Sequence, residues 1–362
     1  SPSRGLGDVY KRQASSSTTQ IGNITGNFIG NYASGRAAHG GAIDNYELAG
    51  TSQIGDINGT FIGNYAESTG SNHSSYGGAI NNSGEIATIT GDFIGNYASS
   101  SGSAAGGAID NSGEIGNITG SFINNTAEST NGLAFGGAIF STSPINISAN
   151  NAQSVFSGNK TISNGSVEQN AIAMYSLYLT DEAAANFGLP SGGFVANETF
   201  ELSPQNPAVL TLKAENNGVI VFNDTIKGGA LDANTLQPIE TPETAFTLNI
   251  TGDKTGQIYL NNAIINANIS IDNTNVYVNT AQNLAQSPTL AVNSGSLTIN
   301  SLPNQSINFQ KFSNTAQINI ASVDVNLQNA TMGQITANQY GNMSGKFTVQ
   351  SLNLLNDSPQ NK

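Results

Sequence analysis

Residues 21–33 read IGNITGNFIGNYA, and the same phrase begins again, with few changes, at Ile54, Ile86 and Ile115. A second phrase, GGAI, follows each copy, at residues 40–43, 77–80, 106–109 and 136–139. A degraded fifth copy of the first phrase, INISANNAQSVFSGN, fills residues 145–159. Self-similarity of this kind is typical of a solenoid, in which each repeat is one structural unit that stacks on its neighbours.

The content of each repeat favours strands over helices. The units are rich in Gly and Asn, contain few strong helix formers, and place Ile, Thr and Phe in two-residue alternation. Within FIGNYA, Phe28 and Ile29 therefore face opposite sides. We expect an all-β fold, a right-handed parallel β-helix, in which each repeat of 29–33 residues forms one coil of three short strands. Each coil rises about 4.8 Å, the spacing between paired strands.

Stacked coils bring equivalent residues into columns, which bury the apolar face that one coil cannot bury alone. An Asn at a bend accepts left-handed backbone and hydrogen-bonds to its copy in the next coil. The paired glycines of GGAI suit a tight turn or a close pass of two backbones. The predicted columns are Phe28, Phe61, Phe93, Phe122 and Phe156; Asn31, Asn64, Asn96, Asn125 and Asn159; and Ile43, Ile80, Ile109 and Ile139.

The alternating motifs F-x-x-N and G-G-A-[ILV] resemble the repeat pair of the chlamydial polymorphic membrane proteins, a family of autotransporters. The resemblance covers about residues 21–160. It implies a β-helical passenger that a C-terminal outer-membrane barrel displays outside the cell, commonly for adhesion. The chain departs from the family in having no Cys, which the family often carries, and in containing no segment with the pattern of a barrel.

The remaining segments suggest four parts. Residues 1–13, SPSRGLGDVYKRQ, share no pattern with the rest of the chain and look like a translated sequencing-adapter remnant outside the protein proper. Residues 14–160 form the repeat β-helix. Residues 161–205 are expected to be an irregular segment with a short helix that begins at Thr180 and ends before Gly188. Short alternating runs in residues 206–362 predict that an irregular β-helix continues in one stack, and that any barrel was lost at the end of a fragment.

In that last part, four pairs of apolar residues are expected to point inward: Leu248 and Ile250, Ile258 and Leu260, Leu297 and Ile299, and Ile318 and Ile320.

Composition excludes several classes of function. Eleven Lys and Arg against 24 Asp and Glu give a net charge of −13, so no nucleic-acid partner is expected, since phosphate binding needs clustered cations. The absence of Cys excludes disulfides, thiolate zinc sites and cysteine nucleophiles.

Few residues suggest chemistry. His39 and His73 lie in the variable loops before GGAI without partners at metal-ligand spacing, which favours surface loops. Asp44 and Asp110 directly follow GGAI, where Asn81 and Phe140 occupy the same register in the other units. A column of Asp can bind Ca²⁺ or supply the paired carboxylates of a glycosidase. Turn residues that cap their own backbone are the favoured interpretation. No catalytic residue, cofactor site or metal site is predicted.

We therefore expect a surface-exposed passenger that acts as an adhesin or surface interaction protein. Its loops, with aromatics such as Tyr76 and Phe135 beside Asp44 and Asp110, are the weak candidates for binding. The expected partners are a host cell surface, matrix or glycan, together with the outer membrane through the missing barrel. The expected location is the surface of a Gram-negative-type bacterium, with possible release outside the cell. The alternative is a β-helical polysaccharide-degrading enzyme or a tailspike-like glycan-binding protein, and a carboxylate site within residues 200–362 stays open.

Overall fold

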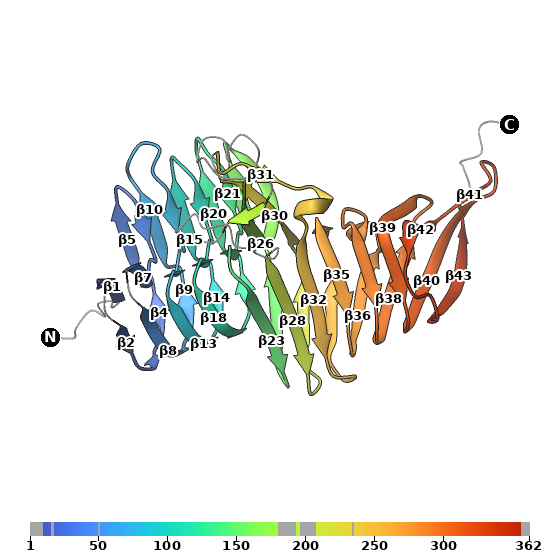
Figure 1. Cartoon of the computed structure of the whole chain (residues 1–362), viewed down its shortest axis with the longest axis horizontal. Coiled ribbons are helices and arrows are strands. Elements are labelled where there is room, and N and C mark those ends of the chain that lie inside the picture. The colour runs from blue at the N-terminus through green and yellow to red at the C-terminus, as the bar shows by residue number, and fades with distance from the viewer. Residues whose placement is uncertain are drawn as a thin grey trace.

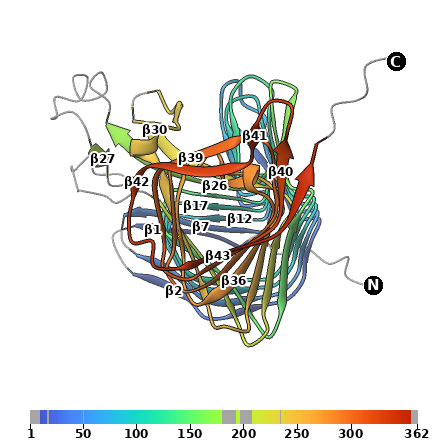
Figure 2. The ribbon, with the colours of Figure 1, turned by 90° about the vertical axis from the view of Figure 1, so that its right-hand side faces the viewer.

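The computed structural model describes residues 10–15, 18–49, 51–179, 193–195, 208–233 and 235–355. In this part of the chain, short strands pair in parallel from coil to coil along one axis, from the blue end to the red end of Figure 1. Figure 2, turned by 90°, looks along the stack and shows the coils superimposed around a common interior. The fold is therefore a parallel β-helix, as the repeats predicted; its right-handed sense stays a prediction.

The strands form four sheets. Sheet 1 has 15 strands: β1 (Tyr10–Ser15), β5 (Tyr32–Gly35), β7 (Ile43–Ala49), β10 (Tyr65–Ser68), β12 (Ile80–Asn82), β15 (Tyr97–Ser100), β17 (Ile109–Asn111), β20 (Thr126–Ser129), β22 (Ile139–Ser141), β25 (Lys160–Ser163), β26 (Ser166–Leu179), β27 (Gly193–Val195), β30 (Thr225–Asp232), β31 (Pro238–Ile239) and β34 (Ile264–Ile265). Sheet 4 has four strands: β6 (Ala38–His39), β11 (Ser75–Tyr76), β16 (Ala104–Ala105) and β21 (Ala134–Phe135).

Sheets 2 and 3 run the length of the stack. Sheet 2 has 12 strands: β2 (Thr19–Ile21), β3 (Ile24–Thr25), β8 (Ser52–Asn58), β13 (Glu85–Thr90), β18 (Glu114–Thr119), β23 (Ile145–Asn150), β28 (Val209–Glu215), β32 (Phe246–Gly252), β35 (Ala267–Ile271), β37 (Thr289–Val292), β39 (Ser306–Asn314) and β42 (Gln334–Tyr340). Sheet 3 has 12: β4 (Phe28–Ile29), β9 (Phe61–Ile62), β14 (Phe93–Ile94), β19 (Phe122–Ile123), β24 (Gln153–Ser157), β29 (Val219–Phe222), β33 (Gln257–Leu260), β36 (Thr274–Thr280), β38 (Gly295–Leu302), β40 (Gln317–Asn326), β41 (Thr331–Met332) and β43 (Lys346–Leu354). Two short 3₁₀ helices, η1 (Pro242–Thr244) and η2 (Ala281–Leu284), interrupt the strands.

A repeat contains more strands than predicted. The second coil runs through β8, β9, β10, β11 and β12, which makes five strands where the sequence predicted three. The additional strands, such as the two-residue β11, lie in the segment between NYA and GGAI that was expected to be loop. Because the coils above and below offer backbone partners, even two residues can pair there, as Ser75 does with Ala38 and Ala104.

The phenylalanines form one stack inside the coils. Their neighbouring ring centroids lie 4.6 to 4.8 Å apart and their planes are within 9° of parallel. Phe222, which the sequence pattern missed, extends the stack at 4.3 Å from Phe156. The isoleucines of GGAI are likewise paired from coil to coil and fully buried. One continuous apolar core runs from Ile24 to Val323.

The asparagines form a hydrogen-bonded ladder. The side-chain nitrogen of Asn64 donates to Oδ1 of Asn96 at 2.8 Å, and the backbone N–H of Asn64 donates to the same oxygen at 3.0 Å. The expectation of left-handed backbone at these asparagines is wrong. The preceding residue takes that conformation, with φ of +63° at Gly30 and +56° at Asn124, because it makes the bend that turns the next amide inward.

The structure explains why both positions of the GG pair in GGAI require glycine. The first adopts positive φ, +63° at Gly77, which favours glycine. The second passes against neighbouring backbone, since a Cβ on Gly78 would lie 2.1 Å from the carbonyl oxygen of Gly107. The predicted tight turn and the predicted close pass are therefore both present, one at each glycine.

Two segments differ from the expected boundaries. Residues 10–13 belong to β1, which pairs in parallel with β7, because an exposed strand edge offers unpaired backbone groups to any extended segment. Residues 161–179 are regular: β25 and β26 form an antiparallel hairpin, and Ile172 continues the column of Ile139. The helix predicted from Thr180 lies outside the described residues.

The C-terminal coils are shorter than the repeats. Ile269 pairs with Leu290, 21 residues later, and among the described residues the coils after β34 add no strand to sheet 1 or sheet 4. The four apolar pairs predicted to point inward are buried, with exposed fractions of 5% or less. In the described residues no helix is long and apolar enough to span a membrane.

Candidate functional site

The structure brings the sequence-predicted binding residues to one side of the stack, where sheet 4 meets sheet 1. Tyr76 and Phe135 belong to the strands of sheet 4, and Asp44 and Asp110 belong to the neighbouring strands of sheet 1. Parallel pairing sets Asp44, Asn81, Asp110 and Phe140 in one column, in the order expected from the alignment of the repeats. We call this region the aspartate corner.

The two aspartates lie in strands, so the interpretation of them as turn residues is wrong. They follow GGAI at the point where parallel pairing between coils begins. Both are buried, with exposed fractions of 4% for Asp44 and 7% for Asp110. Asn81 donates a hydrogen bond of 2.8 Å from its side-chain nitrogen to Asp44 Oδ1. Oδ1 of Asp110 has no hydrogen-bond partner, and burial raises the pKa of Asp110 to about 8.

The aromatic residues of the aspartate corner are packed rather than offered to a ligand. Phe135 is only 7% exposed, and its ring lies 5.5 Å from Phe140 and 5.6 Å from Tyr175. The interpretation of Phe135 as a loop contact is therefore wrong, because Phe140 of the same coil and Tyr175 of the next coil pack around it. Tyr76 is half-buried beside His39, with ring centroids 5.3 Å apart, and burial raises its pKa.

Within the described ranges no group of three or more His, Asp or Glu side chains is placed to hold a metal ion. His73 accepts a hydrogen bond of 2.6 Å at Nε2 from Nε of Arg36, which joins two neighbouring coils. Asp44, Asp110 and Phe135 are buried, so the aspartate corner offers little of its surface for contact.

A different surface, on the outer face of sheet 3, exposes apolar side chains in a regular row. The isoleucine row is formed by the second residue of β4, β9, β14 and β19: Ile29, Ile62, Ile94 and Ile123. The first three are 61%, 37% and 36% exposed. The sequence did carry a signal for this surface, since the alternation in FIGNYA turns Ile29 away from the buried Phe28.

Three residues further along each coil, a tyrosine row lies on the outer face of sheet 1. Tyr32, Tyr65 and Tyr97 are paired across the coils, with ring centroids 5.2 and 5.1 Å apart. The Tyr32 hydroxyl donates to Glu67, and the Tyr97 hydroxyl donates to Glu128. These contacts between coils hold the rings in fixed positions. The rows together give a rigid surface that combines aliphatic, aromatic and acidic groups.

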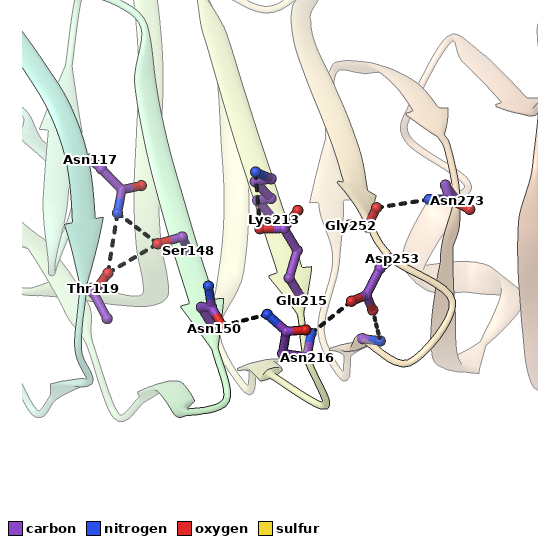
Figure 3. A network of polar contacts seen from close by, with 11 residues as sticks. Asn117, Thr119, Ser148, Asn150, Lys213, Glu215, Asn216, Gly252, Asp253 and Asn273 are labelled. Carbon is purple, nitrogen blue, oxygen red and sulfur yellow. Dashed lines mark hydrogen bonds and ion pairs between the residues drawn. The ribbon is translucent and has the colours of Figure 1, made fainter.

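The corner of the coils between sheets 2 and 3 is polar, and its polar groups hydrogen-bond to one another. Figure 3 shows this edge, where side chains from consecutive coils bind one another. Asn216 donates from its side-chain nitrogen to Oδ1 of Asn150 at 2.9 Å, and its backbone N–H donates to Oδ2 of Asp253 at 2.8 Å. Hydrogen bonds from Asn216 and Thr255 lower the pKa of Asp253 to about 2. Hydrogen bonds between amide and carboxylate groups therefore join consecutive coils at this corner.

Comparisons of the chain with protein-family models, with curated protein sequences and with solved structures find no match.

Proposed function

We propose that this chain is part of a surface-displayed autotransporter passenger that acts as an adhesin. Two features support the proposal. The F-x-x-N and G-G-A-I motifs alternate in phase four times, as in the family that the sequence resembles. The parallel β-helix stacks equivalent positions of consecutive repeats in columns, such as Ile29, Ile62 and Ile94, which suits repeated contacts with an extended partner.

The exposed isoleucine row is the single observation that carries the contact function. Isoleucine gains stability by burial, at roughly 1.5–3 kcal/mol for a full side chain. Three successive isoleucines are nevertheless left 36% to 61% exposed and form an apolar patch along the stack. Contiguous exposed apolar patches on soluble proteins mark interaction sites. The adjacent tyrosine row adds the residue type that is enriched at interfaces.

Binding to epithelial cells and to immobilised matrix proteins tests the proposal. The purified chain should bind at least one of these surfaces, as measured by flow cytometry or by surface plasmon resonance. The double variant Ile62→Asp/Ile94→Asp should lose this binding by about tenfold or more, because two charges replace the apolar patch. The control Val167→Asp changes an apolar residue that is more exposed, at 57%, in the β25–β26 hairpin and should bind as the unmodified chain does.

The salt dependence gives a second readout. The isoleucines that carry the contact are uncharged, so raising the salt concentration from low to physiological should weaken binding little. A chain that binds no cell or matrix surface but cleaves a polysaccharide would contradict the proposal and support the rival interpretation of a β-helical enzyme.

A further inference from the structure

A shallow groove crosses four consecutive coils on the outer face of sheet 2, away from the isoleucine row and the aspartate corner. It encloses about 430 Å³. One wall is a column of amide and carboxylate side chains in equivalent positions of the coils, namely Gln20, Gln53, Glu85 and Glu114. Since these residues are paired in register, the groove runs along the stack axis.

Small residues form the floor of this groove: Gly22, Gly55, Ala87 and Gly116. Ile86 and Ile89 both point into the core, so the two residues between them face outward. Ala87 is exposed, and a Cβ built on Gly22 meets no atom within 4 Å. The floor is therefore open at Gly22 and Ala87, where a ligand can approach closely, whereas Oδ1 of Asn23 lies over Gly55, 2.3 Å from where its Cβ would be.

The chemistry of the wall selects the ligand. Gln53 donates from Nε2 to Oε2 of Glu85 at 2.6 Å, which links two neighbouring coils, and Gln20 and Glu114 at the two ends of the wall are exposed. No Lys, Arg or His lines the groove, so an anionic polymer would meet carboxylates without a counter-charge. Carboxylate and amide groups that accept and donate several hydrogen bonds suit a ligand rich in hydroxyl groups.

A peptide fits less well than a carbohydrate. An extended peptide usually binds a β-structure by adding a strand to a free edge. Here the strands under the groove, such as β8 and β13, already pair on both sides with the coils above and below. The backbone groups of β8 and β13 are therefore occupied, only β2 at the end of sheet 2 keeps an edge without a described partner strand, and side-chain hydrogen bonds supply the recognition along the rest of the groove.

We propose that this groove binds a linear, uncharged glycan lying along the stack, across the coils that contain Gln20 to Glu114. The inference deepens the proposed adhesive function by naming a ligand class for the rod. It concerns a surface different from the isoleucine row, so each can fail without the other.

Isothermal titration calorimetry of the full chain with maltohexaose, cellohexaose and chitohexaose (the N-acetylated form) tests the inference. At least one of these probes should bind, with affinity that changes little with salt. Ala87→Arg places a long side chain across the exposed floor and should reduce the affinity by at least about tenfold. The double variant Glu85→Gln/Glu114→Gln keeps shape but removes charge-assisted hydrogen bonds, and should reduce it about tenfold. Ala152→Arg, at an exposed alanine outside the groove, should leave binding unchanged.

Circular dichroism and the melting temperature establish that each variant is folded. Three outcomes would overturn the inference: none of the three probes binds, Ala152→Arg weakens binding as much as Ala87→Arg does, or the groove binds an oligolysine peptide in preference to every glycan, with strong salt dependence. If Ala87→Arg loses glycan binding while the isoleucine-row variant still binds glycan but not cells, both proposals stand. If the unmodified chain binds cells but none of the probes, only the groove inference fails.

Discussion

The side-chain amide of Asn159 donates a hydrogen bond of 2.8 Å to Oδ2 of Asp224, 65 residues later in the chain. The backbone N–H of Asn159 donates to the same oxygen at 2.8 Å, and that of Gly158 donates to Oδ1 at 3.0 Å. Every step of the ladder before it runs in this direction, from amide nitrogen to the oxygen of the next coil. Asp224 takes the place of the next asparagine and accepts these hydrogen bonds with both carboxyl oxygens, so it is the last step of the ladder in the described residues.

The ladder predicts a large cost for removing one rung. Asn96→Ala removes the oxygen that accepts two hydrogen bonds from Asn64 and the amide that donates to Asn125 and to the carbonyl oxygen of Phe61. Buried donors left without acceptors cost roughly 1–3 kcal/mol each. We expect the free energy of unfolding to fall by about 3 kcal/mol in urea denaturation. Asn146→Ala, at an exposed asparagine with one hydrogen bond, should change it by less than about 0.5 kcal/mol. Equal losses in the two variants would contradict the structural role of the ladder.

The phenylalanine stack offers a comparison between adjacent residues. Phe93 is fully buried between rings at 4.6 and 4.7 Å, whereas Ile94 beside it is 36% exposed. Phe93→Ala opens a cavity in the core and should lower the free energy of unfolding by about 3–5 kcal/mol. Ile94→Ala should lower the free energy of unfolding by less than about 1 kcal/mol, because the Ile94 side chain is partly exposed and packs less closely than Phe93. Denaturation curves of the two variants measure this difference, and a smaller loss for Phe93→Ala than for Ile94→Ala would exclude the stack as core.

Gly78 and Gly22 should respond in opposite ways when alanine replaces them and adds one methyl group. A Cβ on Gly78 would lie 2.1 Å from the carbonyl oxygen of Gly107, so Gly78→Ala must push two coils apart. We expect a loss of at least about 2 kcal/mol of stability. Gly22→Ala meets no atom within 4 Å and should be neutral or slightly stabilising, since alanine restricts the unfolded chain. The melting temperatures of the two variants report the difference. A tolerated Gly78→Ala would show that the coils are less closely stacked than described.

Asp110 predicts a pH dependence of stability. Burial raises the pKa of this carboxyl from 3.8 to about 8, so the folded protein holds the proton more tightly than the unfolded chain. The contribution of the protonated Asp110 carboxyl to the free energy of unfolding is complete below pH 4. It is lost as the pH rises towards 8, where a buried charge forms. Asp110→Asn should therefore leave stability nearly unchanged at pH 4 and raise it at pH 8, by at least about 1.4 kcal/mol, the equivalent of one pKa unit. Asp92→Asn, at an exposed aspartate, should show no such gain. Chemical denaturation at both pH values measures the effect, and an equal change at pH 4 and pH 8 would contradict it.

The repeated phrases predicted the stacking because they fix which residues must be equivalent. Phe28 over Phe61 and Ile43 over Ile80 follow once the repeats are aligned. Phe222 was missed because 65 residues separate its coil from the preceding one, measured from Ile147 to Leu212, so no sequence period marks it. The two-residue strands of sheet 4 were missed for another reason: their pairing depends on neighbouring coils rather than on their own composition.

Burial on the outer side of the coils was less predictable. A residue such as Phe135 alternates outward from its strand, and only the packing of Phe140 and Tyr175 around it decides that it is covered. The same holds for Asp110, whose surroundings come from other coils. In contrast, the exposure of Ile29 follows from the alternation with Phe28 alone. Local pattern thus sets the inward face, whereas contacts between coils decide which outward side chains remain free.

Distances between spin labels test the vertical register most directly. The sequence has no Cys, so labels attach only at introduced cysteines. Asn261→Cys is combined in turn with Ile29→Cys, Ile62→Cys and Ile94→Cys, which precede it by six, five and four coils in the register of sheet 3. At about 4.8 Å per coil, double electron–electron resonance should give backbone separations of about 29, 24 and 19 Å. Distances that do not shorten by one strand spacing at each step would contradict the stacked solenoid.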